Sequence, residues 1–211
     1  MDKNVVRDSG VGFLTRPLQK PHPPIATSAV SPFSGSIKTA AQRGWYPISG
    51  NFCPRTTVAS HWKVYCDGCA DVGRKPDGAA WREARTVVVA PTDQEAEDYI
   101  HDPKRATYSY FDYLITLLKS TNSTAVIRPK KEMTDDEVTA DAVVNEVVIA
   151  GSPRTVVDKL LAYRETVGPF GTLLISSMDW DGPNRAMEKR SMELLANEVM
   201  PQLNRALGAA A

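Results

Sequence analysis

Residues 25–49, IATSAVSPFSGSIKTAAQRGWYPIS, decide the fold. The run at 25–30 is mostly apolar, bounded by prolines and too short for three helical turns, so it predicts a buried strand. The segment SIKTAAQRG then repeats apolar side chains at spacings of three and four, and its last residue, Gly44, suits the left-handed stop of a helix. A second short strand is expected at 45–49. This stretch therefore predicts a strand–turn–helix–strand unit.

The same alternation continues to the end of the chain. Further strands are expected at 85–90, 143–150 and 172–177. Helical patterns lie at 56–73, 93–100, 108–117, 152–161 and 184–207, with Thr56 and Thr57 as N-cap candidates and Pro201 expected to distort the last turns. Strands separated by helices indicate parallel βαβ units. The sequence therefore predicts an α/β protein, either an open sheet or part of a barrel, because a closed (β/α)8 barrel needs eight strands.

Composition excludes several classes of function. The 211 residues carry 25 basic and 25 acidic side chains, and the densest basic run, 128–131, is followed at once by acidic residues, which favours a solvated loop. We therefore expect no nucleic-acid or membrane partner. The chain lacks an apolar segment long enough to span a bilayer and starts without a signal peptide, which predicts a cytoplasmic protein.

Cysteines and histidines offer no metal or redox site in the sequence pattern. Cys66 and Cys69 lie close together, but two thiols without a second pair cannot complete a tetrahedral site. With Cys53 they form an odd, sparse set that predicts no disulfide framework. The three histidines, His22, His61 and His101, are scattered and are expected to be structural.

The turn at 28–36, SAVSPFSGS, is the candidate functional site. A turn after a parallel strand lies at the carboxyl edge of the sheet, where α/β proteins bind ligands. The N–H groups at the start of the next helix favour an anion, and small residues such as Ser34, Gly35 and Ser36 let a phosphate approach closely. The alternative is a serine N-cap without any ligand.

Five segments together resemble the bacterial luciferase-like, flavin-dependent monooxygenases, in the branch that includes limonene-type and diketocamphane-type enzymes. They read PPIATSAVSPFSGSIKTAAQRGWYPIS, HWKVYCDGCADVGRKPD, WREARTVVVAPTDQEAEDYI, VVIAGSPRTVVDKLLAYRETVGPFGTLLI and SMELLANEVMPQL. The GSPxTV and ELxxxEVMPxL motifs are specific in combination. In that family the turn commonly reads AGMSPSSPT, and here Ala29, Val30, Phe33 and Gly35 replace its glycine, methionine, serine and second proline.

The resemblance implies a partial (β/α)8 TIM barrel that corresponds to about strands 5–8 with their helices. Residues 1–24 would then be an extended connection and 25–211 the C-terminal half of the barrel domain, with the N-terminal half absent. Because a half-barrel leaves open strand edges, we expect a homodimer or a complementing N-terminal half.

The resemblance also implies FMN as cofactor, in its reduced form and supplied by a separate NAD(P)H flavin reductase, with O₂ used to oxygenate a small hydrophobic organic substrate. The residues assigned to the cofactor are Ala29, Val30, Ser31, Phe33, Ser34 and Ser36. Met178 and Trp180, after the last strand, are assigned to the substrate, and no catalytic residue is identified. Two alternatives stay open: a non-catalytic chain that binds flavin weakly or only assembles with another chain, and an independent open α/β binding domain.

Overall fold

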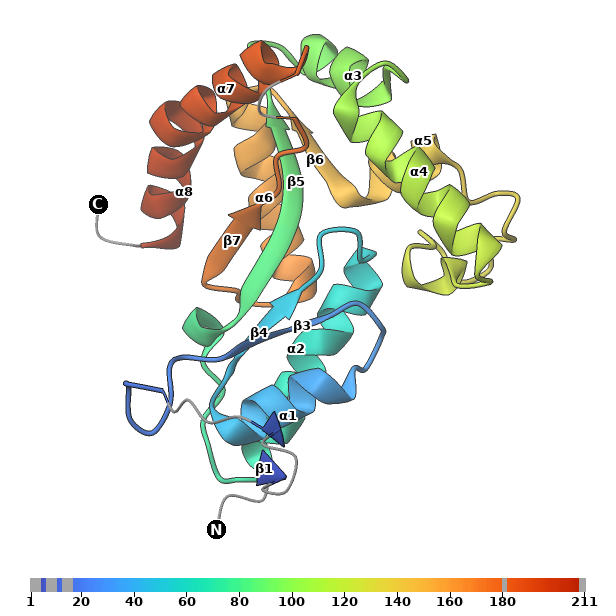
Figure 1. Ribbon diagram of the computed structural model, residues 1–211. Coiled ribbons are helices and arrows are strands. Elements are labelled where there is room, and N and C mark those ends of the chain that lie inside the picture. The colour runs from blue at the N-terminus through green and yellow to red at the C-terminus, as the bar shows by residue number, and fades with distance from the viewer. Residues whose placement is uncertain (1–4, 7–10, 13–16, 180–181, 209–211) are drawn as a thin grey trace.

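The protein forms a parallel sheet flanked by helices in the computed structural model, which describes residues 5–6, 11–12, 17–179 and 182–208 (Figure 1). The strands are β1 (Val5–Val6), β2 (Val11–Gly12), β3 (Ala26–Ala29), β4 (Tyr46–Ser49), β5 (Arg82–Val89), β6 (Val148–Gly151) and β7 (Thr172–Ile175). The helices are α1 (Gly35–Arg43), α2 (Arg55–Ala70), α3 (Asp93–His101), α4 (Ala106–Ser120), α5 (Ala140–Val147), α6 (Pro153–Val167), α7 (Arg185–Leu194) and α8 (Met200–Leu207). The α/β class predicted from sequence is confirmed.

Strand β5 organises the five-stranded sheet. Its first half pairs in parallel with both β4 and β7, so that Arg82 is in register with Ile48 and with Thr172. Its second half, 86–89, pairs in parallel with β6, and β4 also pairs with β3. All pairings in this sheet are parallel, so the strands present their carboxyl ends toward one edge. The separate pair β1 and β2 is antiparallel and lies within the predicted N-terminal connection.

Helices cover the sheet in groups that follow the chain. In Figure 1, α1 and α2 lie beside β3 and β4, α6 lies behind the sheet, and α7 and α8 lie on the β7 side. The packing of α2 toward α6 centres on Trp81, whose ring stacks on Trp62 at 5.4 Å between centroids and meets Phe170 edge-on at 6.2 Å. These rings connect α2, which carries Trp62, to the segment that follows α6, which contains Phe170. Large aromatic rings stabilise such a contact because each buries a large apolar surface.

The predicted strand at 143–150 is wrong over its first five residues. These belong to α5, which Thr139 caps by accepting a hydrogen bond from the Ala142 amide, and only 148–151 form β6. The residues of α5 that are buried are Ala140, Val143, Val144 and Val147. Their spacing of three, one and three is helical, so the apolar face overrode the preference of valine for strands.

Two helices differ in detail from what their local patterns indicate. The N-cap of α2 is Pro54 rather than a threonine, and the helix ends at Ala70, which leaves Val72 exposed. In α4 the tyrosine-rich pattern does not lie wholly in the core, because the Tyr113 side chain is 66% exposed. A single helical pattern cannot tell which aromatic residues face a neighbouring element.

The last helical segment is distorted close to Pro201, as the sequence predicts. A π-helical turn, Leu195–Val199, separates α7 from α8, and Pro201 lies in the first turn of α8. Proline has no N–H to donate, so the helix loses a hydrogen bond at this point. In the described part of the chain, no helix is both long and apolar enough to cross a membrane.

Candidate functional site

The turn between β3 and α1 has a strained backbone. Phe33 adopts a φ of 52°, in the left-handed region, although it carries a bulky side chain. That conformation costs about 1–2 kcal/mol for a residue other than glycine. The Phe33 side chain is 65% exposed, so packing of the ring does little to offset the cost. Contacts of the turn's backbone must therefore hold this shape.

The N-terminus of α1 has no anion supplied by its own first turn. Its N-cap, Ser34, makes no side-chain capping hydrogen bond, and the first turn contains no acidic residue. Ser34 Oγ lies 3.0 Å from Ser36 Oγ, and the Ser36 hydroxyl donates to the Ser28 carbonyl at 3.3 Å. Helix N-termini carry partial positive charge and unpaired N–H groups, so this end of α1 can receive an anion.

Helix α2 holds the turn at two points. The Phe33 amide donates to Ser60 Oγ at 2.9 Å, and the Ser60 hydroxyl donates to the Thr57 carbonyl at 2.6 Å. His61 Nε2 lies 2.9 Å from the Ser31 carbonyl oxygen. Sequence reasoning missed the Phe33–Ser60 contact and the role of His61, because both link residues about thirty positions apart and follow no local pattern.

His61 is fully buried and continues into a chain of polar contacts. Its Nδ1 lies 2.9 Å from Ser49 Oγ, and the Trp81 indole N–H donates to the same hydroxyl oxygen at 3.0 Å. Burial lowers the pKa of His61 below its ordinary value, although the Ser31 carbonyl opposes the effect. The imidazole is therefore neutral near pH 7 and acts as a fixed hydrogen-bonding group.

A buried ionic cluster lies between β5 and α6. Tyr163 donates to Glu83 Oε1 at 2.6 Å, and Arg85 Nε lies 3.2 Å from the same oxygen. Arg85 also donates to the Cys53 carbonyl at 2.9 Å. Burial raises the pKa of Glu83 to about 7, against the attraction of Arg85, and Glu83 Oε2 is buried without a hydrogen-bond partner among the described residues. The cluster connects strand to helix and does not reach the serine turn directly.

Another strand-to-helix turn at this edge joins β6 to α6 and contains the GSPxTV motif. Here Asp93 Oδ1 accepts a hydrogen bond from the Ser152 amide at 2.6 Å, and Thr155 donates to Asp93 Oδ2 at 3.0 Å. These bonds hold the pKa of Asp93 below its usual range. A carboxylate of this chain therefore already occupies the N-terminus of α6.

A cavity of about 700 Å³ lies beside the serine turn. Its lining is Pro32, Phe33, Thr56, Thr57, Ala125, Arg128, Pro129, Lys130, Lys131 and Glu132. The basic run, expected as a solvated loop, thus faces the turn across this cavity. Arg128 is also tied to Asp135 at 2.6 Å. The cavity combines positive charge with the start of α2 and the exposed Phe33 ring.

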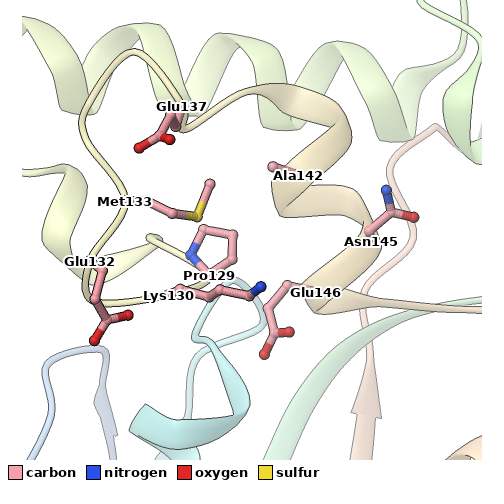
Figure 2. A pocket seen from close by; sticks show the side chains of 8 residues that line it. All are labelled: Pro129, Lys130, Glu132, Met133, Glu137, Ala142, Asn145 and Glu146. Carbon is pink, nitrogen blue, oxygen red and sulfur yellow. The ribbon is translucent and has the colours of Figure 1, made fainter.

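A neighbouring cavity of about 560 Å³ lies on the other side of the same segment (Figure 2). Figure 2 shows it between the 129–137 segment and α5, with Lys130 and Glu146 at its border toward α2. Glu146 accepts from Arg55 Nε at 3.0 Å and so ties α5 to the start of α2. The segment 129–132 therefore lines both cavities.

Of the two residues assigned to the substrate, the structure describes only Met178, and it does not lie at these cavities. Met178 follows β7 and is half-buried, and it lines neither the cavity beside Phe33 nor the one in Figure 2. Trp180 lies outside the described residues. Among the cofactor residues, Ala29 is buried, Val30, Ser34 and Ser36 are half-buried, and Ser31 and Phe33 are exposed.

The chain matches the family model of luciferase-like monooxygenases over residues 6–168. It is 32% identical to 3,6-diketocamphane 1,6-monooxygenase of Pseudomonas putida over 184 residues, which cover 86% of this chain and 47% of that protein. It is 28% identical to limonene 1,2-monooxygenase of Rhodococcus erythropolis, covering 72% of this chain and 36% of that protein.

A solved structure is similar over the same part of the chain. It is the oxygenating constituent of 3,6-diketocamphane monooxygenase from the CAM plasmid of Pseudomonas putida, a type II Baeyer–Villiger monooxygenase in complex with FMN. The TM-score is 0.75 at 28% identity, and the match covers 86% of this chain and 49% of that one. The chain thus spans about half the length of the first curated relatives it matches.

Proposed function

The chain belongs to the luciferase-like monooxygenase family, and from this premise we propose that it holds FMN for a flavin-dependent monooxygenase reaction. In this proposal, reduced FMN and O₂ oxygenate a small hydrophobic organic substrate. A separate NAD(P)H flavin reductase supplies the reduced FMN, and the reaction takes place in the cytoplasm. The activity of relatives that are about twice as long is thereby extended to this chain as a proposal.

The open N-terminus of α1 is the observation that carries the proposal. It follows a parallel strand, has no acidic residue in its first turn and presents the hydroxyls of Ser34 and Ser36. A terminal phosphate fits such a position, because it combines negative charge with several acceptor oxygens. The chemistry of the donors present therefore fits the phosphate of FMN.

We assign the phosphate to the Ser34 backbone and to the hydroxyls of Ser34 and Ser36. The Ser36 hydroxyl would then turn from the Ser28 carbonyl, to which it donates at 3.3 Å, toward the phosphate. The Phe33 amide already donates to Ser60, so Phe33 contributes through its backbone shape and its exposed ring. Ala29, Val30 and Ser31 form the adjoining backbone of the turn. In the facing cavity, Lys130 and Lys131 add favourable charge around an anionic ligand, whereas Arg128 is paired with Asp135 and Glu132 opposes an anion.

When bound, FMN supplies the redox chemistry with O₂, while the protein binds and orients it and limits access of water. In this proposal the residues near the turn bind the phosphate and form one side of the FMN pocket. Met178 and Trp180 are proposed to border the substrate at the same edge of the sheet. Ser177, the neighbour of Met178, donates to Glu188 on α7 at 2.8 Å, which fixes the start of this segment.

The architecture we propose is a partial (β/α)8 barrel in which residues 25–211 act as the C-terminal half. On β7, Leu174 and Ile175 are 37% and 39% exposed, which is unusual for large apolar side chains in a central sheet. A second copy of the chain or a complementing N-terminal half would bury such residues. We propose one of these partners for catalysis.

Titration with FMN and riboflavin tests the phosphate grip. Riboflavin lacks the phosphate, so the chain should bind FMN more tightly than riboflavin. We expect the dissociation constant for FMN, measured by fluorescence quenching, to be at least about tenfold lower, a difference in binding free energy of about 1.4 kcal/mol. Ser34→Ala and Ser36→Ala together should remove most of this preference. Ser120→Ala, which deletes an exposed hydroxyl at the end of α4, is the matched control.

Equal affinity of the unaltered chain for FMN and riboflavin would contradict the proposed phosphate site. Monooxygenase activity is tested separately, by coupling the chain to a flavin reductase and measuring incorporation of ¹⁸O₂ into a bicyclic or monocyclic terpenoid ketone or alkene. FMN binding without incorporation would support the non-catalytic alternative.

A further inference from the structure

We propose that His61 is a positioning residue that holds the serine turn in the shape needed for the phosphate, with Ser60 as the second anchor. This inference rests on the proposed function and adds to it the residues that set the geometry of the site. His61 and Ser60 are consecutive on α2, and they reach Ser31 and Phe33 on either side of Pro32. The turn is thereby fastened at two points separated by a single residue.

The chemistry of its neighbours leaves His61 only one arrangement of hydrogens. The Ser31 carbonyl can only accept, so His61 Nε2 carries the proton and donates. The Trp81 indole can only donate, so Ser49 Oγ accepts from it and its own hydrogen goes to His61 Nδ1. Glu83 is a second acceptor within reach of the Ser49 hydroxyl, but a neutral His61 with its proton on Nε2 can only accept at Nδ1, which fits donation from Ser49 at 2.9 Å.

The strain at Phe33 explains why the turn needs such anchors. A left-handed φ at a bulky residue costs free energy that the exposed ring does not recover. The two anchoring hydrogen bonds offset this cost, because each hydrogen bond made in the folded state stabilises the turn. Because Ser34 follows Phe33 directly, loss of an anchor changes the direction of the backbone at the proposed phosphate site.

Two substitutions of His61 separate its two contacts. In His61→Gln the side-chain amide nitrogen can replace Nε2 and keep the bond to Ser31, whereas the contact with Ser49 is lost. In His61→Asn the amide oxygen can replace Nδ1 and keep the contact with Ser49, whereas the bond to Ser31 is lost. Both variants remove the imidazole ring from the same buried place, so each controls for the other's loss of packing.

The readout is the ratio of FMN affinity to riboflavin affinity. We expect His61→Asn to weaken FMN binding at least about tenfold while riboflavin binding stays within about twofold, and His61→Gln to keep most of the FMN preference. Ser60→Ala should shift the ratio in the same direction as His61→Asn. His101→Asn, on α3 and away from the turn, should leave the ratio unchanged.

Equal loss of the FMN preference in His61→Gln and His61→Asn, or no loss in either, would overturn the positioning role. A second measurement works without flavin: amide hydrogen exchange at the serine turn. Exchange of the Phe33 amide should be faster in His61→Asn than in His61→Gln and the unaltered chain. Identical exchange in all three would also overturn the inference.

The two proposals fail in different ways. If the unaltered chain binds FMN and riboflavin equally, the phosphate site is wrong, and amide exchange alone decides whether His61 holds the turn. If the unaltered chain prefers FMN and His61→Asn retains that preference, the phosphate site stands and the role of His61 is wrong.

Discussion

The N-termini of α1 and α6 have the same design but different occupants. Each helix follows a strand of the parallel sheet, and each has a serine N-cap, Ser34 or Ser152, that makes no side-chain capping hydrogen bond to its own helix. At α6, Asp93, the first residue of α3, accepts hydrogen bonds from the Ser152 amide and the Thr155 hydroxyl. At α1 the first turn contains no acidic residue.

This difference separates a structural turn from a candidate binding turn. The N-termini of α1 and α6 attract negative charge for the same physical reason, the aligned peptide dipoles and unpaired N–H groups. Where the chain provides its own carboxylate, the attraction stabilises the fold. Where it provides none, the position is left for a ligand. The GSPxTV motif, which contributes to the family resemblance, therefore acts in folding, and the serine turn is the site to test for phosphate.

The largest expected effect comes from adding a side chain at Gly151. This residue lies in the turn between β6 and α6, called the closed turn here because Asp93 binds the N-terminus of α6. Gly151 has a φ of 152°, and a Cβ there would lie 2.8 Å from Thr155 Cγ2 and 3.0 Å from Asp93 Oδ1. Gly151→Ala should therefore lower the free energy of unfolding by about 2 kcal/mol or more, measured by urea denaturation. It would also disturb the carboxylate that closes α6.

The serine turn between β3 and α1, called the open turn here because its helix N-terminus binds no carboxylate of the first turn, offers the matched control for that substitution. A Cβ at Gly35 would meet nothing within 4 Å. Gly35→Ala should change the free energy of unfolding by less than about 1 kcal/mol, in the stabilising direction because alanine favours helix more than glycine does. Similar losses for the two variants would show that the two turns do not differ in the way the contacts indicate.

A carboxylate placed at the open turn should make it resemble the closed one. Ser34→Asp adds a good N-cap and a negative charge, so it should stabilise the fold slightly and lower FMN affinity at least about tenfold, or about 1.4 kcal/mol. Ser34→Asn caps similarly without the charge and should lose much less affinity. If both variants lost FMN equally in the fluorescence titration, repulsion of the phosphate would be the wrong explanation.

The smallest expected effect is a change in the free energy of unfolding at acid pH. The pKa of Asp93 is depressed by the Ser152 amide first and then by Thr155. A carboxyl with a depressed pKa in the folded state contributes stability above its unfolded value, and that contribution is lost as pH falls through the folded value. The stability difference between the unaltered chain and Asp93→Asn should therefore be constant from pH 7 to about 5 and shrink below about pH 4.

Urea denaturation at several pH values between 7 and 3 measures this difference. Asparagine keeps an oxygen for the Ser152 amide but replaces Oδ2, the acceptor of Thr155, with an amino group. The part of the difference that changes with pH therefore reports the charge, and the constant part includes the altered contact with Thr155. A difference that does not shrink in acid would mean that the Asp93 charge does not stabilise α6.

Local pattern was enough for most of the fold. An apolar run bounded by prolines located β3, a run of β-branched residues located most of β5, and helical spacing with Gly44 located α1. The alternation of strands and helices predicted a parallel sheet, because these features depend on neighbours a few residues apart. Pattern failed at 143–147, where four buried positions in α5 outweighed the valines' preference for strands. It also could not assign Met178 to a cavity, since side-chain neighbours depend on packing between distant elements.

By itself the sequence determined the fold class, the family and the turn worth testing, since each follows from short motifs and their spacing. Only the tertiary structure decided which helix N-terminus is closed, because Asp93 and Ser152 lie 59 residues apart along the chain. The same holds for His61 and Ser31, which are 30 residues apart, and for the left-handed Phe33. Such contacts form when elements pack together, and no local preference of the residues involved encodes them.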